Sequence, residues 1–89
     1  MTRCVIDGRF GVLESCALRE KIADVQHAIW AHWMRYLFSC CIENDDGSAT
    51  IPADKVSRWL GQKARTYDQL SEKEKDSDRE QADKVLKVL

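Results

Sequence analysis

The chain has 89 residues, enough for one domain around a single small core but not for two, so we treat residues 1–89 as one domain. Its net charge of −1 at pH 7 argues against a dedicated nucleic-acid-binding protein, because such proteins normally carry a net basic field. No run of about 18 apolar residues is present, so we expect no membrane-spanning helix and no membrane partner.

Residues 1–13 form an N-terminal segment ahead of the expected helical part, residues 14–89. Asp7-Gly8 lies between apolar residues, and this dipeptide favours a two-residue hairpin turn because both turn positions need positive φ. We expect either a β-hairpin or irregular structure here. The acid at Asp7 and the absence of a long apolar block argue against a secretory signal.

A long helix is predicted for about residues 14–41. Its apolar residues recur at spacings of three and four and form a continuous stripe: Leu18, Ile22, Val25, Ile29, Trp33, Tyr36 and Cys40. No proline or glycine interrupts these residues. Trp30 lies beside this stripe, which indicates that the helix is covered on more than one side.

A turn is predicted at Asn44–Ser48, where Asn and Asp side chains bond to their own backbone and Gly47 takes the left-handed conformation. An EF-hand calcium loop is excluded here. If Gly47 held the sixth loop position, the first and twelfth ligand positions would be Ile42 and Ala53, which cannot bind calcium. We expect no metal and no cofactor.

Two more helices are predicted, over about 52–64 and 72–88. Pro52 suits a first helical turn, and Val56, Trp59 and Leu60 are expected to form a buried stripe on the helix that follows. Ser71 to Glu74 is a capping box that opens the last helix, whose apolar residues appear late: Ala82, Val85, Leu86 and Leu89. The predicted fold class is all-α, a small three-helix domain.

The four cysteines predict a reducing compartment. They are Cys4, Cys16, Cys40 and Cys41, with no Cys-x-x-Cys pair for zinc and two adjacent residues that cannot easily bridge each other. We expect free, partly buried thiols and a cytoplasmic location.

Two pieces of the chain resemble the ryanodine-receptor repeat domain, which also occurs as short stand-alone proteins in bacteria and phages. The first is His27-Ala28-Ile29-Trp30-Ala31, similar to the family's His-x-x-Trp-Ala helix. The second runs from Tyr67 to Arg79, similar to a tyrosine-leucine turn followed by Glu-Lys-x-x-Asp-Arg at the start of a final helix. With Ile22-Ala23 before the first piece, and Ala82 and Val85-Leu86 after the second, the resemblance covers about a third of the chain. Residues 34–66 lack the family's central Gly-Trp-x-Tyr-Gly segment, so the chain looks like a divergent relative.

The resemblance implies binding of an adenine nucleotide, with the family tryptophan against the base. That role falls on Trp30, accompanied by His27. Bacterial and phage members look like parts of conflict systems that sense or sequester nucleotide signals, which implies a bacterial host cytoplasm and a nucleotide or cyclic oligonucleotide ligand.

The residues themselves suggest a comparable site. An aromatic ring that stacks on a base contributes roughly 1–3 kcal/mol, and nearby cations can hold phosphates. The candidate ligand-binding residues are Trp30, His27, Arg35, Arg58, Lys63, Arg65 and Tyr67. Ser71, Glu74, Asp78 and Arg79 are expected to be structural, with Asp78 and Arg79 forming an ion pair or a bond to the Tyr67 turn. Trp33 and Trp59 lie on apolar stripes and are assigned to the core.

Three functions remain open. The first is a nucleotide-binding module. The second is a protein-interaction or inhibitor module that acts through a helical face, often as a homo-oligomer. The third and least favoured is a DNA-binding helix-turn-helix over residues 52–80, because the acidic start of the last helix would face phosphates. No nucleophile–base pair or phosphate loop can be named, so we expect a binding protein and not an enzyme.

Overall fold

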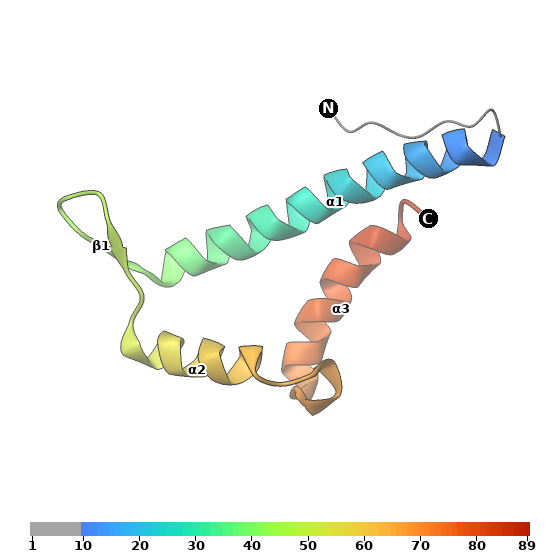
Figure 1. Cartoon of the computed structure of the whole chain (residues 1–89). Helices are drawn as coiled ribbons and strands as arrows, with labels where there is room; N and C mark the ends of the chain where they lie inside the picture. Colours follow the sequence, from blue (N-terminus) through green and yellow to red (C-terminus); the bar gives the residue numbers. More distant parts are fainter. Residues whose placement is uncertain (1–9) are drawn as a thin grey trace.

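Three helices and one short hairpin make up residues 10–89, the part of the chain that the computed structural model describes, with side chains from Cys16 onward (Figure 1). In chain order the elements are α1 Phe10–Cys40, β1 Ile42–Glu43, β2 Ala49–Thr50, α2 Ala53–Lys63, the 3₁₀ turn η1 Tyr67–Gln69, and α3 Glu72–Leu86. The predicted three-helix architecture is confirmed. Within these residues no helix combines the length and the apolar character needed to cross a lipid bilayer.

Helix α1 begins earlier than predicted. Residues 10–13 already belong to it, so the expectation of a hairpin or irregular structure is wrong for these four residues. The Asp7-Gly8 turn lies outside the described residues. At its other end α1 closes with a turn in which the Cys41 N–H donates to the Phe38 carbonyl at 3.2 Å, and the Ser39 hydroxyl donates to the Tyr36 carbonyl at 2.6 Å.

The predicted turn at Asn44–Ser48 is confirmed, and it joins two short antiparallel strands. Ile42 pairs with Thr50 and Glu43 pairs with Ala49. Gly47 has a φ of +87°, a conformation that L side chains rarely adopt. The Asn44 amide donates to the hydroxyls of Ser48 and Thr50, at 3.0 and 2.9 Å, so side chains stabilise a hairpin that has few backbone pairs.

The three helices are arranged as the sides of an open triangle (Figure 1). Helix α1 forms the long side, α2 lies opposite it beyond the hairpin, and α3 rises from the end of α2 to contact α1. The radius of gyration is 18.0 Å, whereas a compact domain of this length has about 12 Å. The chain is therefore more extended than a compact domain of its length, in part because α1 alone has 31 residues.

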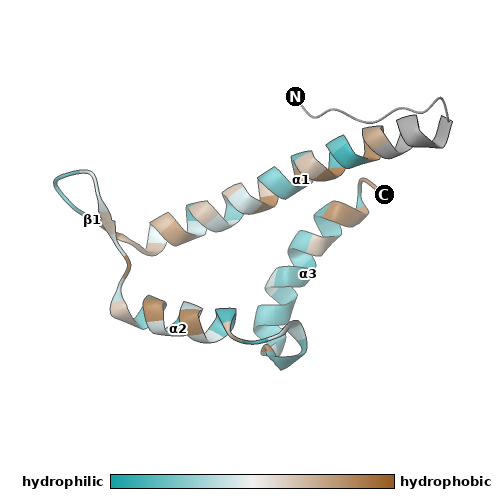
Figure 2. Cartoon of the chain, in the orientation of Figure 1, coloured by the Kyte–Doolittle hydropathy of each residue, from teal (hydrophilic) through white to brown (hydrophobic). Residues whose placement is uncertain are grey.

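No apolar side chain among residues 16–89 is buried, and the single buried residue in that range is Gln81, at 6% exposure. The expected buried stripe of α2 is therefore absent. Val56 and Leu60 are exposed and Trp59 is half-buried, because no other helix covers that side of α2. The exposed large apolar residues are Leu18, Trp30, Tyr36, Phe38, Ile42, Ile51, Val56, Leu60, Tyr67, Leu86 and Leu89. Figure 2 shows apolar residues along α2 and at the end of α3.

The cysteines differ from expectation at one position. Cys16 is disulfide-bonded, whereas Cys40 and Cys41 are free thiols. The prediction of free thiols is therefore wrong for Cys16, because spacing along the sequence does not show which cysteines the fold brings together. The disulfide at Cys16 therefore does not support the prediction of a reducing compartment.

Two glycine-to-alanine substitutions test the backbone conformation, and we expect them to change the free energy of unfolding in opposite directions. Gly47→Ala should lower the free energy of unfolding by about 1–2 kcal/mol, since the new Cβ is disfavoured at positive φ. Gly61→Ala should raise it by about 0.5–1 kcal/mol, because Gly61 lies inside α2 and a Cβ there would meet the Arg65 guanidinium at an ordinary 3.5 Å. Urea denaturation measures both, and equal signs would contradict this backbone.

Candidate functional site

A hollow of about 710 Å³ lies between the three helices and is the candidate functional site. Helix α1 contributes residues from its C-terminal third, including Trp33 and Tyr36, and α2 contributes Arg58 and Trp59. The start of α3 supplies the third wall. A second hollow adjoins the first and shares Trp33 and Trp59 with it.

A chain of aromatic rings connects α1 to α2 along one wall of the hollow. The ring of Trp33 meets the edges of His32 and Tyr36, with centroids 4.8 and 6.3 Å apart. Tyr36 in turn meets Trp59 at 6.2 Å, which links the two helices. Such pairs contribute about 0.5–1.5 kcal/mol each beyond the area they bury. The tryptophans assigned to a core therefore line an accessible cavity.

The charged groups around these rings are mixed. Arg58 and Lys73 face the first hollow together with three carboxylates, Glu74, Asp78 and Glu80. The adjoining hollow adds a second group of predicted site residues, Lys63, Arg65 and Tyr67. The structure thus brings together four of the seven predicted ligand-binding residues: Arg58, Lys63, Arg65 and Tyr67.

The other three predicted ligand-binding residues lie apart from this group. Trp30 is 55% exposed and stacks against His27, with centroids 5.7 Å apart and an interplanar angle of 30°. Neither ring lines the two hollows described above, and neither does Arg35. The sequence signal that could have found Trp33 is its spacing of three from Tyr36, which places both rings on one face of α1.

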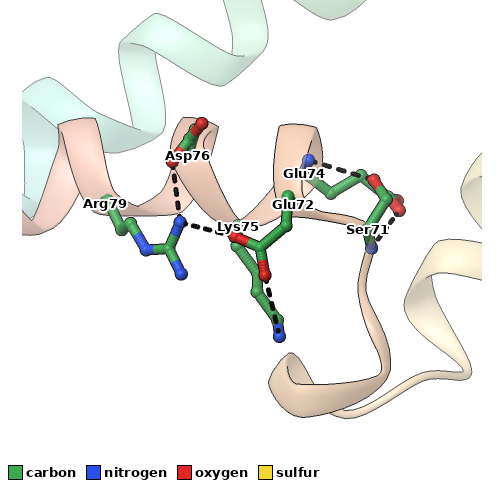
Figure 3. A network of polar contacts seen from close by, with 6 residues as sticks. All are labelled: Ser71, Glu72, Glu74, Lys75, Asp76 and Arg79. Atoms are coloured by element: carbon green, nitrogen blue, oxygen red, sulfur yellow. Dashed lines mark hydrogen bonds and ion pairs between the residues drawn. The ribbon is translucent and has the colours of Figure 1, made fainter.

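The start of α3 is held by the predicted capping box, which is confirmed. The Glu74 N–H donates to the Ser71 hydroxyl at 3.2 Å, and the Ser71 N–H donates to the Glu74 carboxylate at 3.0 Å (Figure 3). These bonds to Ser71 hold the pKa of Glu74 below its ordinary value, and the nearby charges of Arg65 and Arg58 lower it further. The cap therefore fixes an ionised carboxylate at the rim of the hollow.

Arg79 forms two ion pairs within α3. Its guanidinium bonds Asp76 at 2.7 Å and Glu72 at 3.1 Å, and Lys75 lies 3.6 Å from the same Glu72 (Figure 3). Asp76 and Glu72 raise the pKa of Arg79. Asp78 lines both hollows described above. Lys75 also lies 5.7 Å from the Tyr67 ring and so connects α3 to the preceding turn.

Comparison of the chain with protein-family models, with curated proteins and with solved structures finds no match. The resemblance to the ryanodine-receptor repeat domain stays a prediction that rests on the quoted residues.

The capping box predicts a specific response to mutation and pH. Ser71→Ala should lower the free energy of unfolding by about 1 kcal/mol, and Ser71→Asp, which can still cap, should lower it less. Because the folded-state pKa of Glu74 is depressed, its contribution is present above its ordinary value of 4.5 and is lost as pH falls below it. Glu74→Gln should therefore flatten the acid limb of a stability–pH curve. An unchanged limb would contradict the assignment.

Proposed function

We propose that this chain is a protein-interaction module whose folded state is completed by a protein partner. The observation that carries the proposal is the absence of any buried apolar side chain between Cys16 and Leu89. Burial of apolar surface is the dominant favourable contribution to folding, and it has to offset the conformational entropy lost when the chain is ordered. Helices that leave their apolar rows open need another surface to cover them.

Local interactions support the helices but cannot replace that surface. The ion pairs of Arg79 are exposed, and exposed pairs contribute about 0–1 kcal/mol each. The capping box stabilises one helix end and positions no helix against another. A partner that covers the open faces would therefore supply most of the free energy that holds the three helices in place.

Calorimetry tests this function on the isolated chain. A fully packed domain of 89 residues would unfold with an enthalpy of about 60 kcal/mol near 60 °C. At concentrations where the chain is monomeric, as light scattering reports, we expect a much smaller enthalpy, a broad transition and binding of a hydrophobic dye. A monomer that unfolds sharply with the full enthalpy would overturn the proposal.

A second candidate function is nucleotide binding in the hollow. The observation in its favour is that two indoles, Trp33 and Trp59, lie among the cations Arg58, Lys63 and Arg65. An adenine base could stack on an indole while an arginine fork holds a phosphate. This function agrees with the resemblance to the ryanodine-receptor repeat domain, which implies a nucleotide signal in a bacterial cytoplasm.

A panel of adenine nucleotides and cyclic oligonucleotides tests this second candidate by thermal shift. Binding should raise the melting temperature according to the ratio of ligand concentration to Kd. Arg58→Gln should remove the shift, since Arg58 lines the hollow, and Trp30→Ala should retain it, since Trp30 lines neither hollow described above. If Trp30→Ala removed the shift and Arg58→Gln did not, the nucleotide would bind at Trp30 on the exposed face of α1. If no nucleotide raised the melting temperature of the wild-type chain, this function would be excluded.

A further inference from the structure

The turn between β1 and β2 contains Asp46 followed by Gly47, a dipeptide whose backbone can rearrange without an enzyme. The Gly47 nitrogen attacks Cγ of Asp46, an N–Cγ bond forms, and one carboxyl oxygen leaves as water with the carboxyl proton and the amide proton. Water then opens the succinimide ring. Addition at Cγ restores aspartate, whereas addition at the Asp46 backbone carbonyl carbon gives isoaspartate. The sequence consumes no oxidant, reductant or cofactor.

Packing does not restrain this reaction in the folded chain. Residues 42–50 are all exposed, and the hairpin extends away from α3 (Figure 1). No atom lies within 4 Å of the place where a Cβ on Gly47 would stand, so the nitrogen can be approached and water can reach the ring. The restraint therefore has to come from hydrogen bonds within the turn.

The attacked carboxylate is held by Ser48. The Ser48 N–H and the Ser48 hydroxyl both donate to Oδ1 of Asp46, at 2.9 and 2.5 Å. These bonds, with the hydroxyl as the larger cause, hold the pKa of Asp46 below its ordinary value of 3.8. The carboxyl group is thus kept in its ionised form, from which no oxygen can leave as water.

The attacking nitrogen is held by Asn44. The Gly47 N–H donates to the Asn44 carbonyl at 3.1 Å, and the Asn44 N–H donates to the Ser48 carbonyl at 2.9 Å. The Asn44 side-chain amide donates to the Ser48 hydroxyl at 3.0 Å, so this hydroxyl connects the residue that holds the nitrogen to the carboxylate. Ring closure would have to break these bonds.

We infer that Asp46 is a modification site, where isoaspartate forms through a succinimide with Gly47, and that the Ser48 hydroxyl suppresses this reaction while the hairpin is folded. Isoaspartate would lengthen the backbone by one carbon atom and so disrupt the turn that joins α1 to α2. The inference is independent of the proposed interaction function, because it uses only contacts within the hairpin.

Peptide mapping by mass spectrometry, after incubation of the folded chain at neutral pH, measures the rate of isoaspartate formation at Asp46. Ser48→Ala should raise this rate about fivefold or more, the factor that corresponds to one lost hydrogen bond. Ser48→Thr keeps the hydroxyl and should react at the wild-type rate. Far-UV circular dichroism verifies that each variant is folded.

A matched variant separates the Ser48 hydroxyl from the stability of the hairpin. The Thr50 hydroxyl also accepts from the Asn44 amide, at 2.9 Å, but within the described hairpin it makes no hydrogen bond to Asp46. Thr50→Ala should therefore react at nearly the wild-type rate. Asp46→Glu should give no product, because its longer side chain cannot close a five-membered ring.

The unfolded chain supplies the reference rate. In urea the wild-type chain should form isoaspartate at Asp46 severalfold faster than the folded chain, and at a rate similar to that of Asp7-Gly8, the other Asp-Gly pair of the sequence. Equal rates at Asp46 in the folded and unfolded chain would contradict the protection. An unchanged rate in Ser48→Ala, or an equal rise in Thr50→Ala, would overturn the role of the Ser48 hydroxyl. Absence of the product even in urea would overturn the site itself.

Discussion

The need to bury apolar side chains is the constraint on which this structure depends. The chain is 44% hydrophobic, yet the helices meet in an open triangle in which Gln81 is the one buried residue between Cys16 and Leu89. The reason lies in α3, whose first two turns carry charged and polar side chains and can offer no apolar surface to α1 or α2. Its apolar residues come at the far end, where Leu86 and Leu89 remain exposed.

Local interactions explain how the elements persist without such a core. The Asn44 amide network holds the hairpin, the Ser71–Glu74 box begins α3, and the Tyr36–Trp59 contact joins α1 to α2. Each of these involves residues that are near in sequence or a single pair of rings. They define the direction and length of the elements but contribute little free energy to tertiary packing.

Two tryptophans about one helical turn apart on α1 have different surroundings. Trp30 and Trp33 lie three residues apart, but Trp30 stacks on His27 on an exposed face while Trp33 lines the hollow with Trp59. Three of the four cations predicted for a ligand site, Arg58, Lys63 and Arg65, lie near Trp59 because they share α2 and its end with it. A nucleotide, if one binds, would therefore meet the indoles of Trp33 and Trp59.

The sequence alone determined the helices, the Asn44–Ser48 turn with its left-handed Gly47, and the capping box, since all of these depend on residues within a few positions of one another. Tertiary structure decided the rest. Val56 and Leu60 have the spacing of a buried stripe, and only the tertiary structure shows that the described part of the chain leaves them exposed. Arg79 likewise has several acidic neighbours, and the direction of each side chain around the helix selects Asp76 and Glu72. Spacing specifies which residues share a face, whereas the path of the whole chain specifies what that face meets.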